Sequence, residues 1–326
     1  IPMGFLAKAS VSDLFEDHKL EGGIRVPSRF NGSEFFVTYD NNKQRIDRRL
    51  ALYRRVLTEA RPFDLAQNEP FRSGKEQILG MYQLKYPLSV HASVRGISSL
   101  RFDRNFIKAQ NEVSFESPIE REKRVGLRFE YVFDNTYNYS LNLLHGSRMK
   151  VYLEGMHQFE FDFIDGFNID LNKGFTGILG VDARHYVQIL QHSVLALRGA
   201  SALSFGSKPN LYYLGGANNQ LFNSFDQSTP TGNRDFAFQT NANHMRGFRN
   251  NIRNGTSFAL INTEFRIPIF KYLLGNNRGG SFIRNLQVVG FSDLGLAWYG
   301  LGPNSSDNPI NTERVVTNNI VMEIKY

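Results

Sequence analysis

The stretch MKVYLEGMHQFEF, residues 149–161, alternates between two kinds of side chain along an extended backbone. One side carries Met149, Val151, Leu153, His157, Phe159 and Phe161, and the other carries Lys150, Tyr152, Glu154, Met156, Gln158 and Glu160. Alternation with a period of two is the pattern of a β-strand that has two unlike faces. The segments 127–133, 179–189 and 195–205 repeat it. The sequence therefore predicts an all-β protein.

Weaker alternation predicts further strands at 14–26, 34–41, 45–56, 78–88, 92–104, 256–269, 285–299 and 315–326. Most exceed the roughly 5–6 residues of strands in soluble proteins, and reach the roughly 9–11 that cross a bilayer at a tilt. Their second face mixes Arg, Glu, Asp, Gln and Tyr, which suits a water-filled lumen with paired charges. We predict a transmembrane antiparallel β-barrel. A soluble sandwich or lectin-like fold is the alternative, because its outer face would also be polar.

The composition of the 326 residues is compatible with this fold. There is no cysteine, which excludes thiolate metal sites and cysteine nucleophiles. The 28 Phe and 14 Tyr residues suit aromatic belts at two membrane interfaces. The net charge of +7 comes from scattered cations, with small clusters at 48–49, 54–55 and 121–124. Because these clusters lie in or beside strand-like segments and no recognition helix accompanies them, we expect no nucleic-acid binding.

The expected connections differ greatly in length. His192 separates two strands almost directly, and residues 87–91 form another short link. By contrast, 207–255 is one long connection rich in Asn, Gly, Ser, Thr and Gln. Such a connection is uncommon in a compact soluble domain but typical of the external loops of outer-membrane barrels.

The long connection contains Met245-Arg246-Gly247-Phe248, and two acids follow it on separate expected strands, Glu264 and Asp293. A guanidinium offers five donors in a rigid fork that can pair with carboxylates. Gly247 permits a tight turn, and the ring of Phe248 can pack against the wall of the expected barrel. Alternation places Glu264 and Asp293 on the polar faces of their strands, opposite Ile261, Phe265, Ile267 and Ile269 in one case and Leu294, Leu296 and Trp298 in the other. We predict that Arg246 holds the loop inside the lumen through these acids.

Four stretches in this order resemble the barrel of the BamA family, which comprises outer-membrane assembly factors and two-partner secretion transporters. They are Tyr212-Tyr213-Leu214-Gly215-Gly216, Met245-Arg246-Gly247-Phe248, Asn262-Thr263-Glu264-Phe265-Arg266-Ile267-Pro268 and Phe291-Ser292-Asp293-Leu294-Gly295. The Arg-Gly-aromatic tripeptide is similar to the family's signature in its sixth extracellular loop, and Phe291-Ser292-Asp293 to its Phe-x-Asp signature. Phe291, Gly295, Gly215 and Gly216 are expected to support the loop. The Arg-Gly pairs at 95–96 and 198–199 lack the aromatic residue, so the order of the motifs carries the resemblance.

The resemblance implies a bacterial outer-membrane location and a barrel of about 16 strands in the full protein. Residues 1–326 are then one barrel domain, expected to lack some strands at both ends, with 207–255 folded into the lumen. The implied function is the insertion or translocation of polypeptides without a cofactor, through a weakly paired seam whose opened edge accepts client strands. The implied partners are unfolded outer-membrane proteins, outer-membrane lipids and lipopolysaccharide, and accessory lipoproteins. A passive porin or ligand-uptake barrel, or a relative that anchors a periplasmic or secreted module, remains an alternative.

The sequence does not point to an enzyme. The seven histidines have no metal-ligand spacing, and His185 falls on an apolar face. There is no Gly-x-Ser-x-Gly elbow and no phosphate-binding Gly-Lys-Ser/Thr loop. Asp182 and Arg184 share a polar face and are interpreted as a charge pair across strands. We therefore expect no catalytic residue and no metal site.

Overall fold

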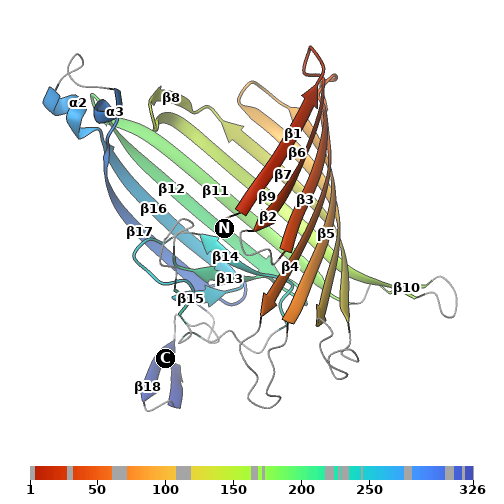
Figure 1. Cartoon of the computed structure of the whole chain (residues 1–326). Coiled ribbons are helices and arrows are strands. Elements are labelled where there is room, and N and C mark those ends of the chain that lie inside the picture. Colours follow the sequence, from red (N-terminus) through yellow and green to blue (C-terminus); the bar gives the residue numbers. More distant parts are fainter. Residues whose placement is uncertain are drawn as a thin grey trace. The chain divides into compact units, whose positions relative to one another are not determined.

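The computed structural model describes residues 4–27, 32–60, 72–107, 119–162, 168–170, 173–216, 224–226, 229, 235–243, 245–274, 281–304, 312–317 and 320–325. Most of these residues are in β-strands (Figure 1). The chain falls into two compact units. Unit 1 holds Ile1–Pro87, Val94–Phe129 and Glu154–Phe175, and unit 2 holds Leu88–Ser93, Glu130–Leu153 and Thr176–Tyr326.

Among the described residues, the main sheet has 14 strands, and most neighbours in it are also successive in the chain. In spatial order they are β1 (Gly4–Ser12), β2 (His18–Pro27), β3 (Gly32–Asn41), β4 (Asp47–Ala60), β5 (Arg72–Pro87), β6 (Ala92–Ile107), β7 (Glu120–Asp134), β9 (Leu143–Asp162), β11 (Phe175–Leu190), β12 (Ser193–Phe205), β16 (Ser257–Ile267) and β17 (Val288–Trp298). β8 (Tyr137–Ser140) and β10 (Asn168–Asp170) pair with β9. The predicted all-β antiparallel fold is confirmed.

In three single segments the structure differs from the strands that the sequence predicted. β1 was not predicted, because Phe5, Leu6, Ala7 and Ala9 give it apolar or small residues on both faces. The single strand expected at 315–326 is a hairpin of β18 (Thr312–Thr317) and β19 (Ile320–Lys325). Ile269, expected on a strand, begins the helix α2 (Ile269–Leu274), because Pro268 has no N–H to continue the strand pairing.

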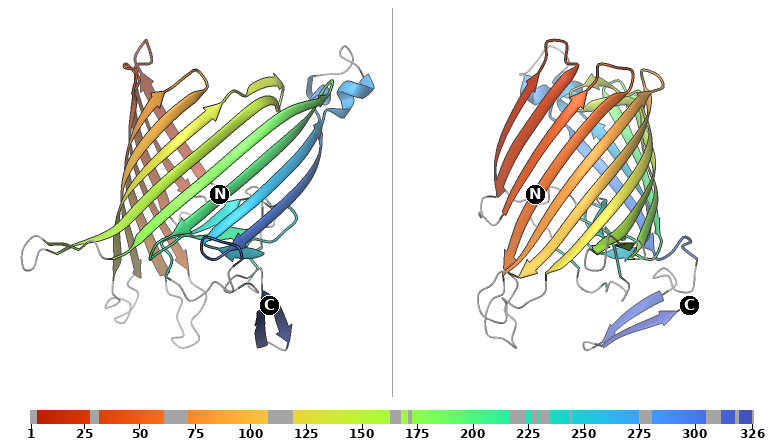
Figure 2. Two further views of the ribbon diagram at one scale, coloured as in Figure 1. Left: turned by 180° about the vertical axis from the view of Figure 1, so that it is seen from behind. Right: turned by 90° about the vertical axis from the view of Figure 1, so that its right-hand side faces the viewer.

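In unit 1 the antiparallel register separates two faces, and the right-hand view of Figure 2 shows its first strands side by side in red to orange. One face, here the charged face, carries ion pairs between adjacent strands, such as Asp40 with Arg49 and Asp47 with Lys85. The other, here the apolar face, exposes large hydrophobic side chains, including Leu20, Ile24, Phe35, Tyr39, Leu50, Leu52, Tyr82 and Leu84. Alternation along each strand produces this separation.

In unit 2 the segment 207–255, expected as one long connection, contains three short strands. β13 (Leu211–Leu214) pairs with β14 (Gln239–Asn243) and with β15 (Arg253–Gly255) in a separate sheet (Figure 1). Leu211 and Leu214 are fully buried. The ring of Tyr212 packs edge-on against Phe258 of β16 at 5.0 Å between centroids. β13 thus pairs its backbone with two other strands of the same segment and packs against β16.

Between β16 and β17 lie two short helices, α2 and α3 (Ser281–Arg284). The Tyr272 hydroxyl accepts a hydrogen bond from the backbone N–H of His192 at 3.0 Å. Lys271 Nζ donates to Ser140 Oγ at 2.6 Å. These contacts fasten α2 to the turn that joins β11 and β12 and to the end of β8. Nowhere in the described part of the chain is a helix both long enough and apolar enough to span a membrane.

Candidate functional site

Arg246 projects from a tight turn in the segment 207–255. The backbone N–H of Phe248 donates to the carbonyl of Met245 at 3.4 Å, and Gly247 has φ +86°, a conformation that favours glycine. Gly216 pairs with Met245 in an antiparallel bridge and donates its N–H to the Phe248 carbonyl at 3.0 Å. The turn that presents Arg246 is therefore held by its own segment.

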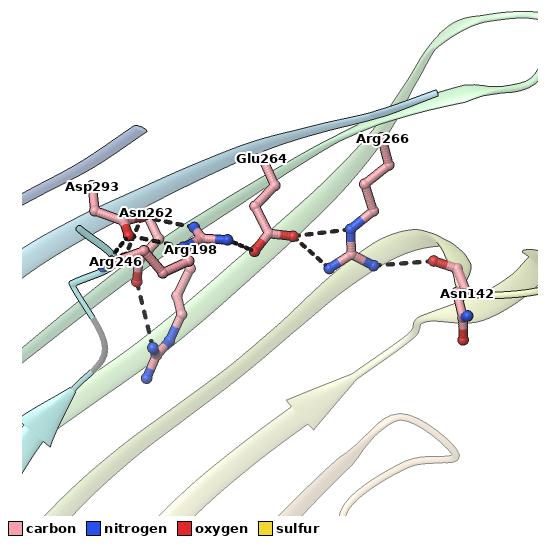
Figure 3. Close-up of polar contacts among 7 residues, drawn as sticks. All are labelled: Asn142, Arg198, Arg246, Asn262, Glu264, Arg266 and Asp293. Atoms are coloured by element: carbon pink, nitrogen blue, oxygen red, sulfur yellow. Dashed lines mark hydrogen bonds and ion pairs between the residues drawn. The ribbon is translucent and has the colours of Figure 1, made fainter. Parts of the chain in front are cut away.

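Arg246 contacts both acids named by the sequence (Figure 3). Its backbone N–H and its Nε both donate to Asp293 Oδ2 at 2.9 Å, and its NH2 donates to Asp293 Oδ1 at 2.8 Å. Its NH1 donates to Glu264 Oε1. The guanidinium carbon lies 4.1 Å from the centre of the Phe291 ring. One side chain of the segment thus reaches two neighbouring strands, with the bidentate geometry that makes guanidinium–carboxylate pairs strong.

Burial decides how much these contacts contribute. The side chain of Asp293 is only 1% exposed and that of Arg246 is 26% exposed. A carboxylate this deeply buried is costly without a partner, so loss of Arg246 would leave it uncompensated. Hydrogen bonding to Asp293 and Glu264 raises the pKa of the Arg246 guanidinium, against the opposing effect of desolvation. Arg246 is therefore cationic at every physiological pH.

The strand register explains why these side chains meet. Arg198 of β12, Asn262 of β16 and Asp293 of β17 lie directly across from one another. Glu264 lies opposite Phe291 in the next row of the same face. The face of Asn262 and Glu264 is the one on which the segment 207–255 packs, so Arg246 approaches both rows at once.

Three residues that extend the cluster were not among the predicted site residues. Asn262 Nδ2 donates to Asp293 Oδ1 at 2.8 Å. Arg266 donates to Glu264 Oε2 through NH2 at 2.6 Å and to the backbone carbonyl of Asn142 through NH1 at 3.0 Å. Arg198 NH1 lies 3.4 Å from Asn262 Oδ1 (Figure 3). Alternation in β16 puts Asn262 and Arg266 on the face of Glu264, and the sequence could have indicated these two residues for that reason. Arg198 lies on β12, and only the register of β12 with β16 places it beside Asn262.

The glycines expected to support the loop each lie at a close approach. A Cβ on Gly215 would be 1.9 Å from the carbonyl oxygen of Arg249, and φ is +115° there. Gly216 has φ +72°, and a Cβ would meet the side chain of Asn250. A Cβ on Gly295 would be 2.5 Å from Met245 Sδ. Gly295 thus leaves room on β17 for the residue that precedes Arg246.

Two other expectations are modified by the contacts. Phe248 is 43% exposed and contributes to the turn through its backbone. Asp182 does form the expected charge contact with Arg184, but along one strand, and its partner on the next strand is Arg198 at 2.7 Å. On β11, His185 is exposed, and its Nδ1 lies 2.7 Å from Ser147 Oγ.

Chemically, this cluster is suited to holding a segment in place. Its members are guanidinium, carboxylate and amide groups that hydrogen-bond one another. Among the described residues no group of three or more His, Asp or Glu side chains is arranged to hold a metal ion. The arrangement joins the segment 207–255 to β16 and β17, and we refer to Arg246, Glu264, Asp293 and Asn262 as the loop cluster.

Comparisons with known proteins show the fold. No family model matches the sequence. No curated protein matches it. Among solved structures, BamA from Haemophilus ducreyi, crystallised without POTRA domains 1–3, is similar with a TM-score of 0.51 and 10% sequence identity, over 91% of this chain and 55% of that one. CdiB from Acinetobacter baumannii is similar with a TM-score of 0.52 and 11% identity, over 98% of this chain and 52% of that one. The chain therefore has the fold of these β-barrels, and it spans about half the length of each.

Proposed function

We propose that this chain is a β-barrel of the bacterial outer membrane that inserts or translocates polypeptides, with the segment 207–255 held in its lumen by Arg246. The observation that carries the proposal is the loop cluster. It joins a long connection to two strands of the sheet, in a fold similar to that of BamA and CdiB. A pore for passive diffusion has no evident need for so many charged contacts to one loop.

The two faces of the sheet support a membrane location. The charged face of unit 1 carries paired acids and bases, as a water-filled lumen requires. The apolar face exposes leucine, isoleucine, phenylalanine and tyrosine side chains, which lipid would cover. In unit 1, more residues separate β4 from β5 and β6 from β7 than separate β1 from β2 and β3 from β4, and antiparallel order makes these two kinds of connection alternate along the sheet. By this pattern the long connections face the cell exterior.

The proposed mechanism uses no cofactor and no covalent step. Unfolded outer-membrane proteins would pair their strands with an exposed sheet edge, as in strand addition. β1 stands first in the sheet order, and every one of its residues is exposed. The loop cluster would keep the segment 207–255 in place while the edge is occupied. Lipopolysaccharide and accessory lipoproteins are the further partners of this proposal.

A reconstitution experiment tests the proposal. The purified chain is placed in phospholipid vesicles and a urea-unfolded outer-membrane barrel protein is added as client, with folding followed by its heat-dependent shift in gel mobility. We expect faster client folding than in empty vesicles, and loss of the acceleration in Asp293→Ala. Asp40→Asn, which breaks an ion pair between β3 and β4 in unit 1, serves as the control and keeps the acceleration. Folding rates equal to those of empty vesicles, or a steady open conductance without acceleration, would refute the proposal and favour a passive porin.

A further inference from the structure

The hairpin of β8 and β9 folds over one face of unit 2, at the end where β11 joins β12. Ser147 Oγ lies 2.7 Å from Nδ1 of His185 on one face of β11, whereas Leu143 belongs to a buried cluster with Tyr186, which points to the other face. Regular alternation would keep Ser147 and Leu143 on the same face, because they are four positions apart. The change of face falls at Gly146, whose φ is +107°, a conformation that favours glycine.

Strand register identifies the covered face as the one that carries the loop cluster. Tyr186 of β11 lies opposite Ala196 of β12, and Ala196 lies opposite Glu264 of β16. The next row of the same face, nearer the joined ends of β11 and β12, consists of Gln188, Val194 and Arg266. The buried cluster consists of Leu143, Tyr186, Val194 and Ala196. The tip of the hairpin therefore packs beside the loop cluster, toward the end of the strands.

The tip reaches across the last row of this face. On β11, Gln188 Nε2 donates to the hydroxyl of Tyr139 at 3.2 Å. On β16, Arg266 donates through NH1 to the backbone carbonyl of Asn142 at 3.0 Å (Figure 3). The buried cluster lies between these two contacts, on β12. The hairpin thus crosses three strands of the main sheet.

Two polar contacts from outside the main sheet hold the same tip. Lys271 of α2 donates to Ser140 Oγ at 2.6 Å. Gln287, which directly precedes β17, donates through Nε2 to the carbonyl of Leu141 at 2.8 Å. We call residues 137–144 the strap. Among the described strands β8 pairs with β9 alone, so side chains from α2, β11 and β16 decide whether the strap stays closed.

Glu264 joins the strap to the loop cluster. Its Oε1 accepts a hydrogen bond from Arg246, and its Oε2 accepts from Nε and NH2 of Arg266 at 2.9 Å and 2.6 Å (Figure 3). Because two nitrogens of Arg266 are held by this carboxylate, the third is directed at the carbonyl of Asn142. One acid therefore orients the arginine that holds the segment 207–255 and the arginine that holds the strap.

We propose that the strap is a gate at the end of the lumen where β11 joins β12, and that Glu264 is a positioning residue shared by this gate and the segment 207–255. The inference rests on the proposed barrel, in which the face of Glu264 lines the lumen. The segment 207–255 follows the other end of β12, so the two elements close the lumen from opposite ends. Opening the strap breaks side-chain contacts and exposes Leu143, but it leaves the backbone pairing of the main sheet intact.

A cysteine under the strap tests the gate, because the chain has no cysteine of its own. Ala196→Cys places a thiol in the buried cluster on β12, and Ala51→Cys places one at a buried position of β4 in unit 1. The rate of modification by a maleimide is followed by mass spectrometry on the purified chain in detergent micelles. We expect Arg266→Gln, which removes charge-assisted hydrogen bonds, to speed modification at position 196 roughly tenfold and to leave position 51 unchanged.

The matched control is Arg49→Gln, which breaks an ion pair in unit 1 and should leave the rate at Ala196→Cys unchanged. A general loosening of the fold would instead speed modification at Ala51→Cys as well. Modification of Ala196→Cys that is equally fast with and without Arg266→Gln overturns the gate, and so does an equal increase at both reporter positions.

The shared role of Glu264 is tested by comparing two rates in the same variants, maleimide modification of Ala196→Cys and trypsin cleavage of the segment 207–255. Glu264→Gln should speed both roughly fivefold, since the amide has lost the charge that holds both arginines. Lys271→Gln should speed only the modification, and Asp293→Ala only the cleavage. A Glu264→Gln variant that changes one rate and not the other contradicts the shared role.

Client folding in vesicles is measured in parallel on the original chain. Folding no faster than in empty vesicles, with a strap that responds to Arg266→Gln as expected, refutes the proposed function alone. Accelerated client folding with a strap that does not respond refutes only this inference.

Discussion

Charge pairs on the charged face of unit 1 differ from those of the loop cluster in unit 2. In unit 1 the pair of Arg49 and Asp40 joins two strands that are already hydrogen-bonded side by side, and the arginine side chain is half exposed. In the loop cluster, Arg246 comes from a separate segment, reaches two strands, and meets a carboxylate that is almost fully buried. A pair between paired strands adds little, since the backbone already holds them, whereas the loop cluster contacts a segment whose described strands form a sheet of their own.

The largest effect expected from this difference is that of Asp293→Ala. The change removes three hydrogen bonds from Arg246 and one from Asn262, and leaves the guanidinium with Glu264 alone. Breaking a buried ion pair costs about 3 kcal/mol, so the opened segment should be populated roughly a hundredfold more. Trypsin cleavage after Arg249 or Arg253, followed by mass spectrometry, measures the opening. Cleavage as slow as in the original chain would show that the loop cluster does not hold the segment.

The next effect concerns the backbone beside the loop cluster. Gly215→Ala places a Cβ on the carbonyl oxygen of Arg249 at a residue with positive φ. Gly247→Ala has the same kind of φ, but a Cβ there meets no atom within 4 Å. We expect about 3 kcal/mol of local destabilisation for the first change and about 1 kcal/mol for the second. Hydrogen exchange of residues 211–216 measures the difference, and equal effects would mean that the turn is not packed as described.

A smaller effect is expected for Glu264→Gln. The amide keeps an oxygen for Arg246 and Arg266 but loses the charge, while Asp293 continues to hold Arg246 in a bidentate pair. The expected cost is about 1 kcal/mol, which accelerates trypsin cleavage of the segment roughly fivefold. Should this variant release the segment as fully as Asp293→Ala does, the two acids contribute equally and Asp293 is not the main partner of Arg246.

The smallest effect is expected for a charge pair on the charged face of unit 1. Asp40→Asn in unit 1 removes the charge partner of Arg49, on strands whose backbone pairing is continuous. Exposed pairs contribute about 0.2–1 kcal/mol, so the midpoint of urea unfolding and the cleavage of the segment 207–255 should stay close to those of the original chain. A clear shift in either measurement would remove the distinction between the two kinds of pair.

Much of the fold followed from alternation alone. The long strands of the main sheet from β2 onward lie where alternation placed them, apart from their ends, whereas the short strands β8 and β10 were not predicted. β1 was not predicted because its residues do not divide into a polar and an apolar face. The paired strands β18 and β19 were predicted as one strand, although Asn318-Asn319 between them is a residue type that favours turns and was an available signal for a break. The short strands within 207–255 carry no alternation of useful length, and they form because the segment packs against β16.

For the candidate site, the sequence named Arg246, Glu264 and Asp293 through their order along the chain and their place on polar faces. It could not assign the atoms that meet. That Asp293 takes three of the donors of Arg246 depends on how the turn at Gly247 is seated, and on the space that Gly295 leaves for Met245. Whether this cluster acts as a latch during client insertion stays a prediction.

The sequence by itself determined which residues can share a face, because side chains alternate along an extended backbone whatever the strand pairs with. It therefore set the charged and apolar faces and the candidates for charge contact. Only the tertiary structure decided which rows align, since register is a relation between strands distant in sequence. Arg198 reaches Asp182 and Asn262, Arg266 reaches the carbonyl of Asn142, and Arg54 and Arg104 share Glu76, through pairings that no single strand encodes.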